Sequence, residues 1–187
     1  GPHVRRELRE QYERWQEKDL SYDDWVNYVL VELLGYEKSF LDAYSESEPP
    51  PEQFIHTVPE YGEVIRPNML LLLRNPDEGP GADEPQMLIM KMPEDREGRS
   101  LSRRIPEARW SASPISRMAE LLRATGIRIG LVTDGEQWTL VDVPTSGDDR
   151  VVGTGSWLAS DWDTYEVAVR SFVDILGQRR FFALGED

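Results

Sequence analysis

The sequence comprises 187 residues with a formal net charge of −14, and its 39% hydrophobic and 10% aromatic content is typical of a folded globular protein. The absence of cysteine excludes disulfides, thiolate zinc sites and cysteine nucleophiles, and it favours an intracellular, cytoplasmic location. No apolar run approaches about 18 residues, which argues against a membrane-spanning segment.

Two amphipathic helices are predicted near the start of the chain. Gly1-Pro2-His3 is typical of the remnant of a purification tag, so residues 4–187 are expected to form a single domain at the N-terminus of a longer protein. Apolar residues that recur every three or four positions predict a helix over 4–18. In the second helix Ser21 is the predicted N-cap and Gly35 the predicted end.

The stretch Ile65–Pro93 predicts a β-hairpin with a long loop. Two short apolar runs, Met69–Leu73 and Met87–Met92, flank a connection rich in Gly, Pro, Asp and Glu. Before this hairpin, the proline-rich run Ser45–Gln53 predicts a loop, because consecutive prolines remove hydrogen-bond donors. Phe54–Val58 predicts a short strand.

A polar, arginine-rich connection, Glu94–Ser113, follows the hairpin and shows no sustained periodicity. Connections of this length in compact domains are either functional or disordered. Ser113-Pro114 then predicts the start of a helix, with serine as N-cap and proline in the first turn, and Gly126 predicts its end.

The last third of the chain predicts a second hairpin and a final helix. Ile127–Val132 and Gln137–Val143 flank the Asp134-Gly135 pair, which is the strongest hairpin signal in the sequence. A short strand at Val151–Val152 and a helix over Asp163–Leu176 follow. The inward face of this helix is predicted to carry Tyr165, Val169, Phe172, Val173 and Leu176. Together the elements predict an α/β (α+β) fold, a mixed central sheet of four to five strands flanked by helices.

Residues of the first hairpin resemble the active site of the PD-(D/E)XK nuclease fold. That signature places a Pro-carboxylate pair at the start of one strand and a carboxylate, any residue and a lysine in the next. These places here read Pro67-Asn68 and Ile89-Met90-Lys91. The resemblance implies metal-binding acids at Asn68 and Ile89 and the catalytic lysine at Lys91. Because Mg²⁺ requires anionic oxygen ligands, two of these positions have lost the chemistry. An active nuclease would need other carboxylates, such as Glu63, Asp77 or Glu84.

A second resemblance covers Ser111–Pro144. The pattern consists of a Ser-Pro pair, a leucine-rich helix with Leu-Leu-Arg, a Thr-Gly pair followed by an apolar strand, and a Thr-Asp-Gly turn before a Trp. This pattern resembles the N-terminal region of large bacterial type IIG-like DNA methyltransferases. It also resembles related adenine methylases of phage-defence systems such as DISARM and BREX. The resemblance implies a nuclease-like domain ahead of a methylase core that uses S-adenosylmethionine. It implies DNA, other defence-system subunits and that core as partners. The chain itself has no glycine-rich cofactor loop and no Asn-Pro-Pro-aromatic sequence, so no cofactor is expected in this part.

The charge is distributed unevenly. Between Arg96 and Arg128 there are eight arginines and three glutamates, a balance of +5, whereas the remaining 13 basic and 32 acidic residues give −19. Such asymmetry indicates either a patch that faces a polyanion or a partner, or arginines that pair with the protein's own carboxylates. The predicted DNA- or partner-binding residues are Lys91, Arg103, Arg104, Arg109 and Arg117.

Three functions are consistent with these patterns. The first is a catalytically inactive nuclease-like domain of a restriction-modification or phage-defence methyltransferase, which contributes DNA positioning or partner-subunit contacts. The second is an active Mg²⁺-dependent DNA endonuclease with a migrated site. The third is an acidic structural or regulatory docking module. The sequence favours the first, in which Asn68, Ile89 and Lys91 form a vestigial site.

Overall fold

The computed structural model of the chain describes residues 2–74, 77–78, 83–94, 99–144 and 152–177. The chain forms two compact units. One comprises the chain up to Ser39 together with the segment from Trp157, and the other spans Phe40–Ser156. The interval 4–187, predicted as one domain, thus contains both units. Within the described ranges no helix is long and apolar enough to cross a membrane.

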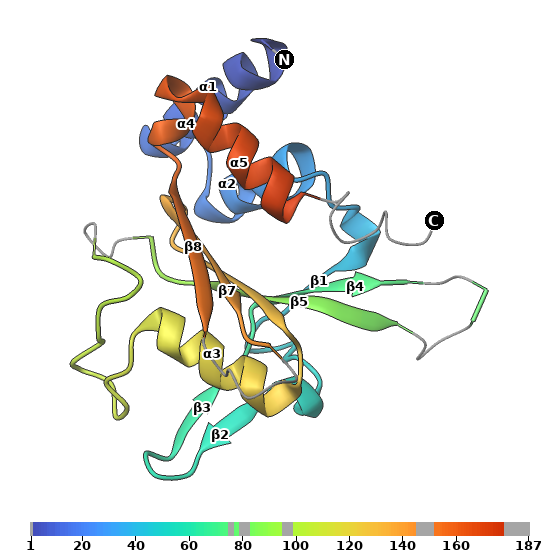
Figure 1. Cartoon of the computed structure of the whole chain (residues 1–187), viewed down its shortest axis with the longest axis vertical. Coiled ribbons are helices and arrows are strands. Elements are labelled where there is room, and N and C mark those ends of the chain that lie inside the picture. Colours follow the sequence, from blue (N-terminus) through green and yellow to red (C-terminus); the bar gives the residue numbers. More distant parts are fainter. Residues whose placement is uncertain (1, 75–76, 79–82, 95–98, 145–151, 178–187) are drawn as a thin grey trace. The chain divides into compact units, whose positions relative to one another are not determined.

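The first unit is helical. Its helices are α1 (Pro2–Gln16), α2 (Tyr22–Tyr28), α4 (Asp161–Thr164) and α5 (Glu166–Leu176) (Figure 1). The N-cap prediction for α2 is confirmed, because Ser21 Oγ accepts a hydrogen bond from the Asp24 N–H at 3.1 Å. Helix α2 continues into a π-helical turn, Val29–Leu33, and Gly35 follows with φ 79°, the left-handed conformation that ends helices.

Aromatic residues form the core of this unit. Trp25, Trp162 and Phe172 are almost fully buried, and the ring centroids of the last two lie 4.7 Å apart. The prediction of one continuous final helix is wrong, because extended backbone at Tyr165 (φ −118°, ψ 103°) separates α4 from α5. The Tyr165 side chain is 60% exposed and does not belong to the inward face, whereas Val169 does.

A six-stranded mixed sheet runs through the second unit in the order β1-β4-β5-β6-β7-β8 (Figure 1). The strands are β1 (Leu41–Ala43), β4 (Met69–Leu73), β5 (Glu84–Lys91), β6 (Ile129–Thr133), β7 (Gln137–Asp142) and β8 (Gly153–Leu158). Strands β5 and β6 are parallel, and the pairs β1–β4, β4–β5 and β6–β7 are antiparallel. A separate antiparallel ribbon consists of β2 (His56–Val58) and β3 (Glu63–Ile65).

The mixed α/β class and both predicted hairpins are confirmed, but the number of strands is wrong. The predicted four to five strands are six in the described sheet, with the ribbon in addition. Strand β1 is only three residues long and is defined by its pairing with β4, so its sequence carries no periodic signal. Strand β8 begins at Gly153 rather than at the predicted Val151–Val152, of which Val152 precedes the strand and Val151 lies outside the described residues.

Helix α3 (Pro114–Thr125) packs against β6, β7 and the ribbon strand β2 (Figure 1). Its predicted ends are confirmed: Ser113 Oγ accepts the Ser116 N–H at 3.1 Å, and Gly126 is left-handed with φ 76°. Alternate strand residues build the core on this face, namely Leu70, Leu72, Leu88, Met90, Val132 and Val141. The intervening residues Met69, Leu71, Met87 and Ile89 are buried as well, so β4 and β5 are apolar on both faces.

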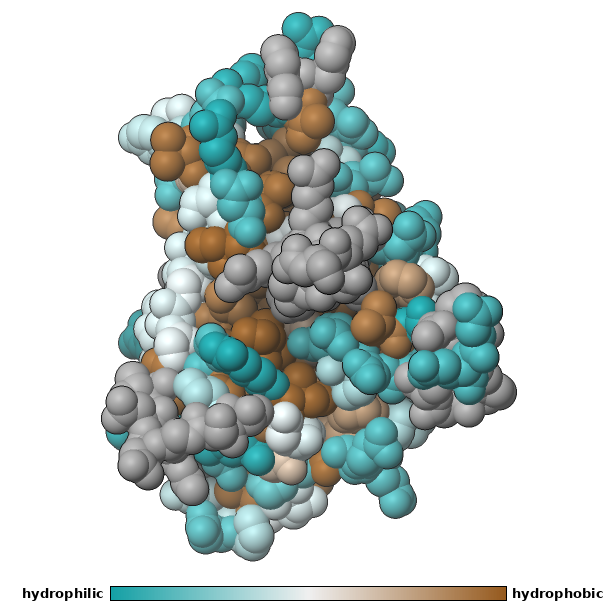
Figure 2. Space-filling view, turned by 45° about the vertical axis from the view of Figure 1, so that its right-hand side comes forward, coloured by the Kyte–Doolittle hydropathy of each residue, from teal (hydrophilic) through white to brown (hydrophobic). Residues whose placement is uncertain are grey.

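Large apolar side chains are exposed at seven of the described positions, between 42% and 77% of their surface. They are Val4, Tyr61, Val64, Leu158, Tyr165, Val167 and Ile175. Figure 2 shows hydrophilic residues over much of the described surface, with apolar residues between them. Tyr61 and Val64 belong to the β2–β3 ribbon and its turn, which α3 contacts.

Candidate functional site

Asn68 links the two strands that carry the positions predicted to match the nuclease motif. Its backbone N–H donates to the Ile89 carbonyl at 2.9 Å, and its side-chain Oδ1 accepts from the Lys91 backbone N–H at 2.7 Å. The Asn68 carbonyl accepts from the Tyr44 N–H at 2.9 Å, just beyond β1. Asn68, Ile89 and Lys91 are therefore neighbours in the sheet, and the asparagine side chain holds the end of β5.

The chemistry of these neighbours does not fit a nuclease metal site. Ile89 is fully buried and supplies no ligand atom, and Asn68 already uses its carbonyl oxygen on the backbone of β5. Lys91 is half-buried and carries the single charge of the three. Because Mg²⁺ is held by anionic oxygens, the motif positions alone cannot bind it.

The carboxylates considered as substitutes do not converge on this place. Glu84 begins β5 whereas Lys91 ends it, a separation of seven residues or roughly 23 Å along the strand. Asp77 lies between β4 and β5, and Glu63 belongs to the ribbon strand β3. Among the residues that the structure describes, no three or more His, Cys, Asp or Glu side chains are grouped so that they could hold a metal ion.

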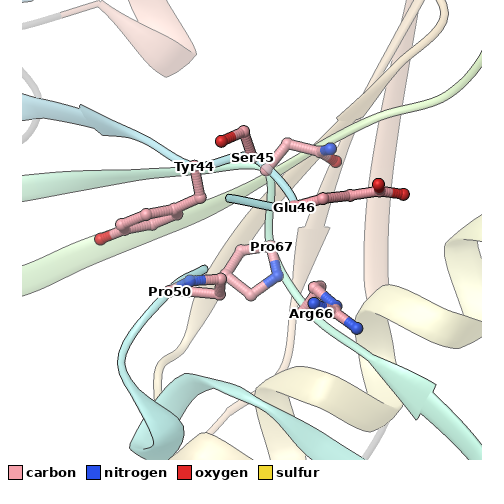
Figure 3. A pocket seen from close by; sticks show the side chains of 7 residues that line it. Tyr44, Ser45, Glu46, Pro50, Arg66 and Pro67 are labelled. Carbon is pink, nitrogen blue, oxygen red and sulfur yellow. The ribbon is translucent and has the colours of Figure 1, made fainter. Parts of the chain in front are cut away.

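A cavity of about 390 Å³ opens beside Asn68. Its lining includes Tyr44, Glu46, Pro50, Arg66, Pro67 and Asn68. Figure 3 shows the Glu46 and Arg66 side chains on one side of the cavity and the Tyr44 ring on the other. Burial, reinforced by the charge of Asp42, raises the pKa of Tyr44 to about 12, so its hydroxyl stays protonated at neutral pH. With one carboxylate and one guanidinium, the cavity lacks the pair of acids that Mg²⁺ requires.

Arg117 anchors the arginine-rich connection to the ribbon. From α3 its guanidinium binds the Glu63 carboxylate at two points, with Nη1–Oε1 at 2.7 Å and Nη2–Oε2 at 3.2 Å. Its Nε donates to the Ala112 carbonyl at 3.1 Å, and Nη2 also donates to the Trp110 carbonyl. The guanidinium carbon lies 5.3 Å from the Trp110 ring centroid. Because Arg117 is 8% exposed and its donors meet protein acceptors, it positions the connection and leaves little surface for DNA.

These contacts lower the pKa of Glu63. The hydrogen bond from Arg117 is the largest cause, and the Trp110 N–H at 3.0 Å and the charge of Arg109 act in the same direction, against the opposing effect of desolvation. Glu63 therefore remains ionised at neutral pH and is committed to Arg117. No local pattern predicts this pair, because its members are 54 positions apart in the sequence.

Further hydrogen bonds fix the described part of the connection, residues 99–112. The buried Leu101 donates its N–H to Gln137 Oε1 at 3.2 Å and accepts the Ile115 N–H at 3.1 Å. The Ile105 N–H donates to the Ser111 carbonyl at 3.0 Å, which closes a loop between them. Strand β7 and helix α3 thus position a segment that has no helix or strand of its own.

The arginines between Arg96 and Arg128 fall into two groups. Three pair with carboxylates: Arg117 with Glu63 at 2.7 Å, Arg123 with Glu120 at 3.9 Å and Arg128 with Asp142 at 2.7 Å. Arg99, Arg103, Arg104 and Arg109 lie exposed on the connection, and no salt bridge joins them to another described residue. Arg96 lies outside the described residues. Internal pairing therefore accounts for the arginines of α3 and its end, whereas those of the connection are exposed and form no salt bridge with a described residue, although the charge of Arg109 acts on Glu63.

Comparison of the chain with protein-family models, with curated proteins and with solved structures found no match. The resemblances to PD-(D/E)XK nucleases and to bacterial DNA methyltransferases therefore stay predictions.

Proposed function

We propose that the second unit is a nuclease-like module without nuclease activity, which contacts DNA through the exposed arginines of the connection as part of a restriction-modification or phage-defence methyltransferase. The division of the arginines carries this proposal. Arg103, Arg104 and Arg109 lie on a loop that Arg117 and Glu63 hold in place, and within the described chain no carboxylate pairs with the three.

The charge of the connection supports contact with phosphates. Residues 99–112 contain four arginines and one glutamate, while the whole chain carries −14. A guanidinium presents a planar fork of donors that matches two phosphate oxygens, and neutralised phosphates release their counterions. The acidic remainder would repel DNA, so we expect the contact to be confined to the connection and its immediate neighbours.

The absence of catalysis rests on the motif positions. Asn68 and Ile89 occupy the places of the two acids, and each has a structural role, the first as a hydrogen-bond acceptor for β5 and the second within the buried sheet. Lys91 keeps a charge that can meet a phosphate, but a lysine alone cannot activate water for hydrolysis.

The test is equilibrium binding of a fluorescent DNA duplex to the full chain. We expect the double variant Arg103→Ala/Arg104→Ala to bind about ten- to sixty-fold more weakly at about 0.1 M salt, because two phosphate contacts are lost. The matched control is Arg123→Ala/Arg128→Ala, which removes the same charge from residues that pair internally. The control should stay within about threefold of the unmodified chain.

Two results would contradict the proposal. Equal losses in both double variants would mean that total charge, and not the connection, governs binding. If the unmodified chain binds no duplex, whereas Arg103→Ala/Arg104→Ala prevents its binding to an isolated methylase core, the connection is a surface for a protein partner and the DNA contact is wrong.

A further inference from the structure

A second cavity, of about 410 Å³, lies where the connection meets the ribbon turn and the start of α3. Its size falls within the range of about 300–1,000 Å³ that is usual for ligand pockets. Its lining residues include the aromatic Tyr61 and Trp110, the cationic Arg104 and the hydroxyl-bearing Ser102 and Ser111. Aromatic surface, a cation and hydroxyl groups therefore line one space.

The aromatic part of the cavity is a supported stack. The Tyr61 and Trp110 rings lie 6.0 Å apart between centroids with an angle of 20° between their planes. Trp110 is held through its N–H by Glu63 at 3.0 Å and through its carbonyl by Arg117, whose guanidinium lies 5.3 Å from its ring. Tyr61 completes the stack and remains 44% exposed. Its ring therefore presents fixed aromatic surface to the cavity and to solvent.

The polar part of the cavity is positive. Arg104 is exposed there, and Arg109 Nη1 lies over the ribbon turn, 3.6 Å from where a Cβ of Gly62 would be. The start of α3 is closed by its own cap, because the Ser113 hydroxyl accepts the Ser116 N–H, so the helix end is not the attractive feature. The cations of the connection lie beside the aromatic stack.

We infer that this cavity binds one unpaired nucleotide of a DNA strand, with its base stacked on the exposed surface of Tyr61 and its phosphate on Arg104. Stacking on aromatic side chains is open to any base, because every base has a π-face, whereas a base inside a duplex is already stacked and cannot enter. The inference rests on the proposed DNA contact and adds to it a preference for unpaired DNA.

The test compares two fluorescent ligands, a thymidine oligomer of about 12 nucleotides and a duplex of equal length, each bound to the full chain at low salt. Tyr61→Ala should weaken binding of the single strand by about five- to 150-fold and leave duplex binding within about twofold. Tyr61→Phe keeps the ring and should bind the single strand as the unmodified chain does. The matched control is Tyr165→Ala, which removes a 60% exposed tyrosine from the other unit and should change neither affinity.

Single-strand binding that is unaffected by Tyr61→Ala would overturn the inference, as would an equal loss for single strand and duplex. The melting temperatures of Tyr61→Ala and Tyr61→Phe, measured in parallel, are expected to agree within a few degrees, so that weaker single-strand binding by Tyr61→Ala reflects the lost ring and not a loss of folding. If duplex binding requires Arg103 and Arg104 while Tyr61→Ala has no effect on the single strand, the proposed function stands and this inference alone fails. If the unmodified chain binds neither ligand, both fail.

Discussion

Arg117→Ala is expected to lower the stability of the second unit substantially. The change removes four hydrogen bonds at once: two to Glu63, one to Ala112 and one to Trp110. It also leaves the half-buried Glu63 carboxylate with the Trp110 N–H, at 3.0 Å, as its remaining hydrogen-bond donor.

The magnitude follows from the burial of the pair. Removing one partner of a fully buried ion pair costs about 3–5 kcal/mol, but the Glu63 side chain is 22% exposed and regains some hydration. We therefore expect a loss of about 2–3 kcal/mol in the free energy of unfolding, or a fall of about 4–12 °C in the melting temperature. The control is Arg123→Ala on the same helix, whose 3.9 Å contact with Glu120 is exposed and should contribute less than about 0.5 kcal/mol.

The assay is urea unfolding of each variant at two pH values. The pKa of Glu63 is lowered in the folded chain from its ordinary value of 4.5, so its ionised pair with Arg117 stabilises the fold above that value. As the pH falls through the lowered pKa this stabilisation is lost. The difference between the unmodified chain and Arg117→Ala should therefore be full near pH 7 and clearly smaller at about pH 3.

A double-mutant cycle decides whether the pair is responsible. In Glu63→Ala/Arg117→Ala no carboxylate is left without its partner, so the double variant should lose less stability than the sum of the two single variants. Strict additivity, or an Arg117→Ala loss below about 0.5 kcal/mol, would refute the reasoning. Trypsin should also cleave the connection faster in Arg117→Ala, because its anchor to the ribbon is gone.

Three further substitutions test other parts of the account. Gly130→Ala would place a Cβ 2.5 Å from Met118 Sδ and should lower stability by about 1–3 kcal/mol in thermal unfolding, and the double variant with Met118→Ala should lose less than the sum of the two single variants. Ser113→Ala removes the N-cap of α3 and should cost about 1 kcal/mol in the same assay. Asn68→Asp keeps an oxygen for the Lys91 N–H and should fold normally, yet neither it nor the unmodified chain should nick supercoiled plasmid with Mg²⁺. Nicking by either would mean that a metal site has formed elsewhere.

Local chemistry explains which elements could be predicted from the sequence. Ser113 and Pro114 begin α3 and Gly126 ends it, and each acts only on backbone within about one helical turn of itself. The Asp134-Gly135 pair sets its hairpin by its own backbone preferences. Strands β4 and β5 can be predicted for a similar reason, because each contains a run of apolar residues that is buried on both faces of the sheet. Such signals do not depend on distant parts of the chain.

Long-range contacts explain what the sequence could not predict. Strand β1 exists through its pairing with β4, and Glu63 gained its role from an arginine 54 positions away. The arginines of this stretch look alike in the sequence, and among the described ones only the fold separates those that pair internally from Arg99, Arg103, Arg104 and Arg109. Tyr61 carried no signal either, because its ring acquires a role through Trp110, which belongs to a different segment.

The salt dependence of duplex binding tests the central claim most directly. The logarithm of the binding constant should fall linearly with the logarithm of the salt concentration, and each phosphate contact contributes about 0.9 to the slope. We predict that Arg103→Ala/Arg104→Ala flattens the slope by about two, while Arg123→Ala/Arg128→Ala leaves it parallel to that of the unmodified chain. Parallel lines for all three proteins would contradict the claim that the connection contacts DNA.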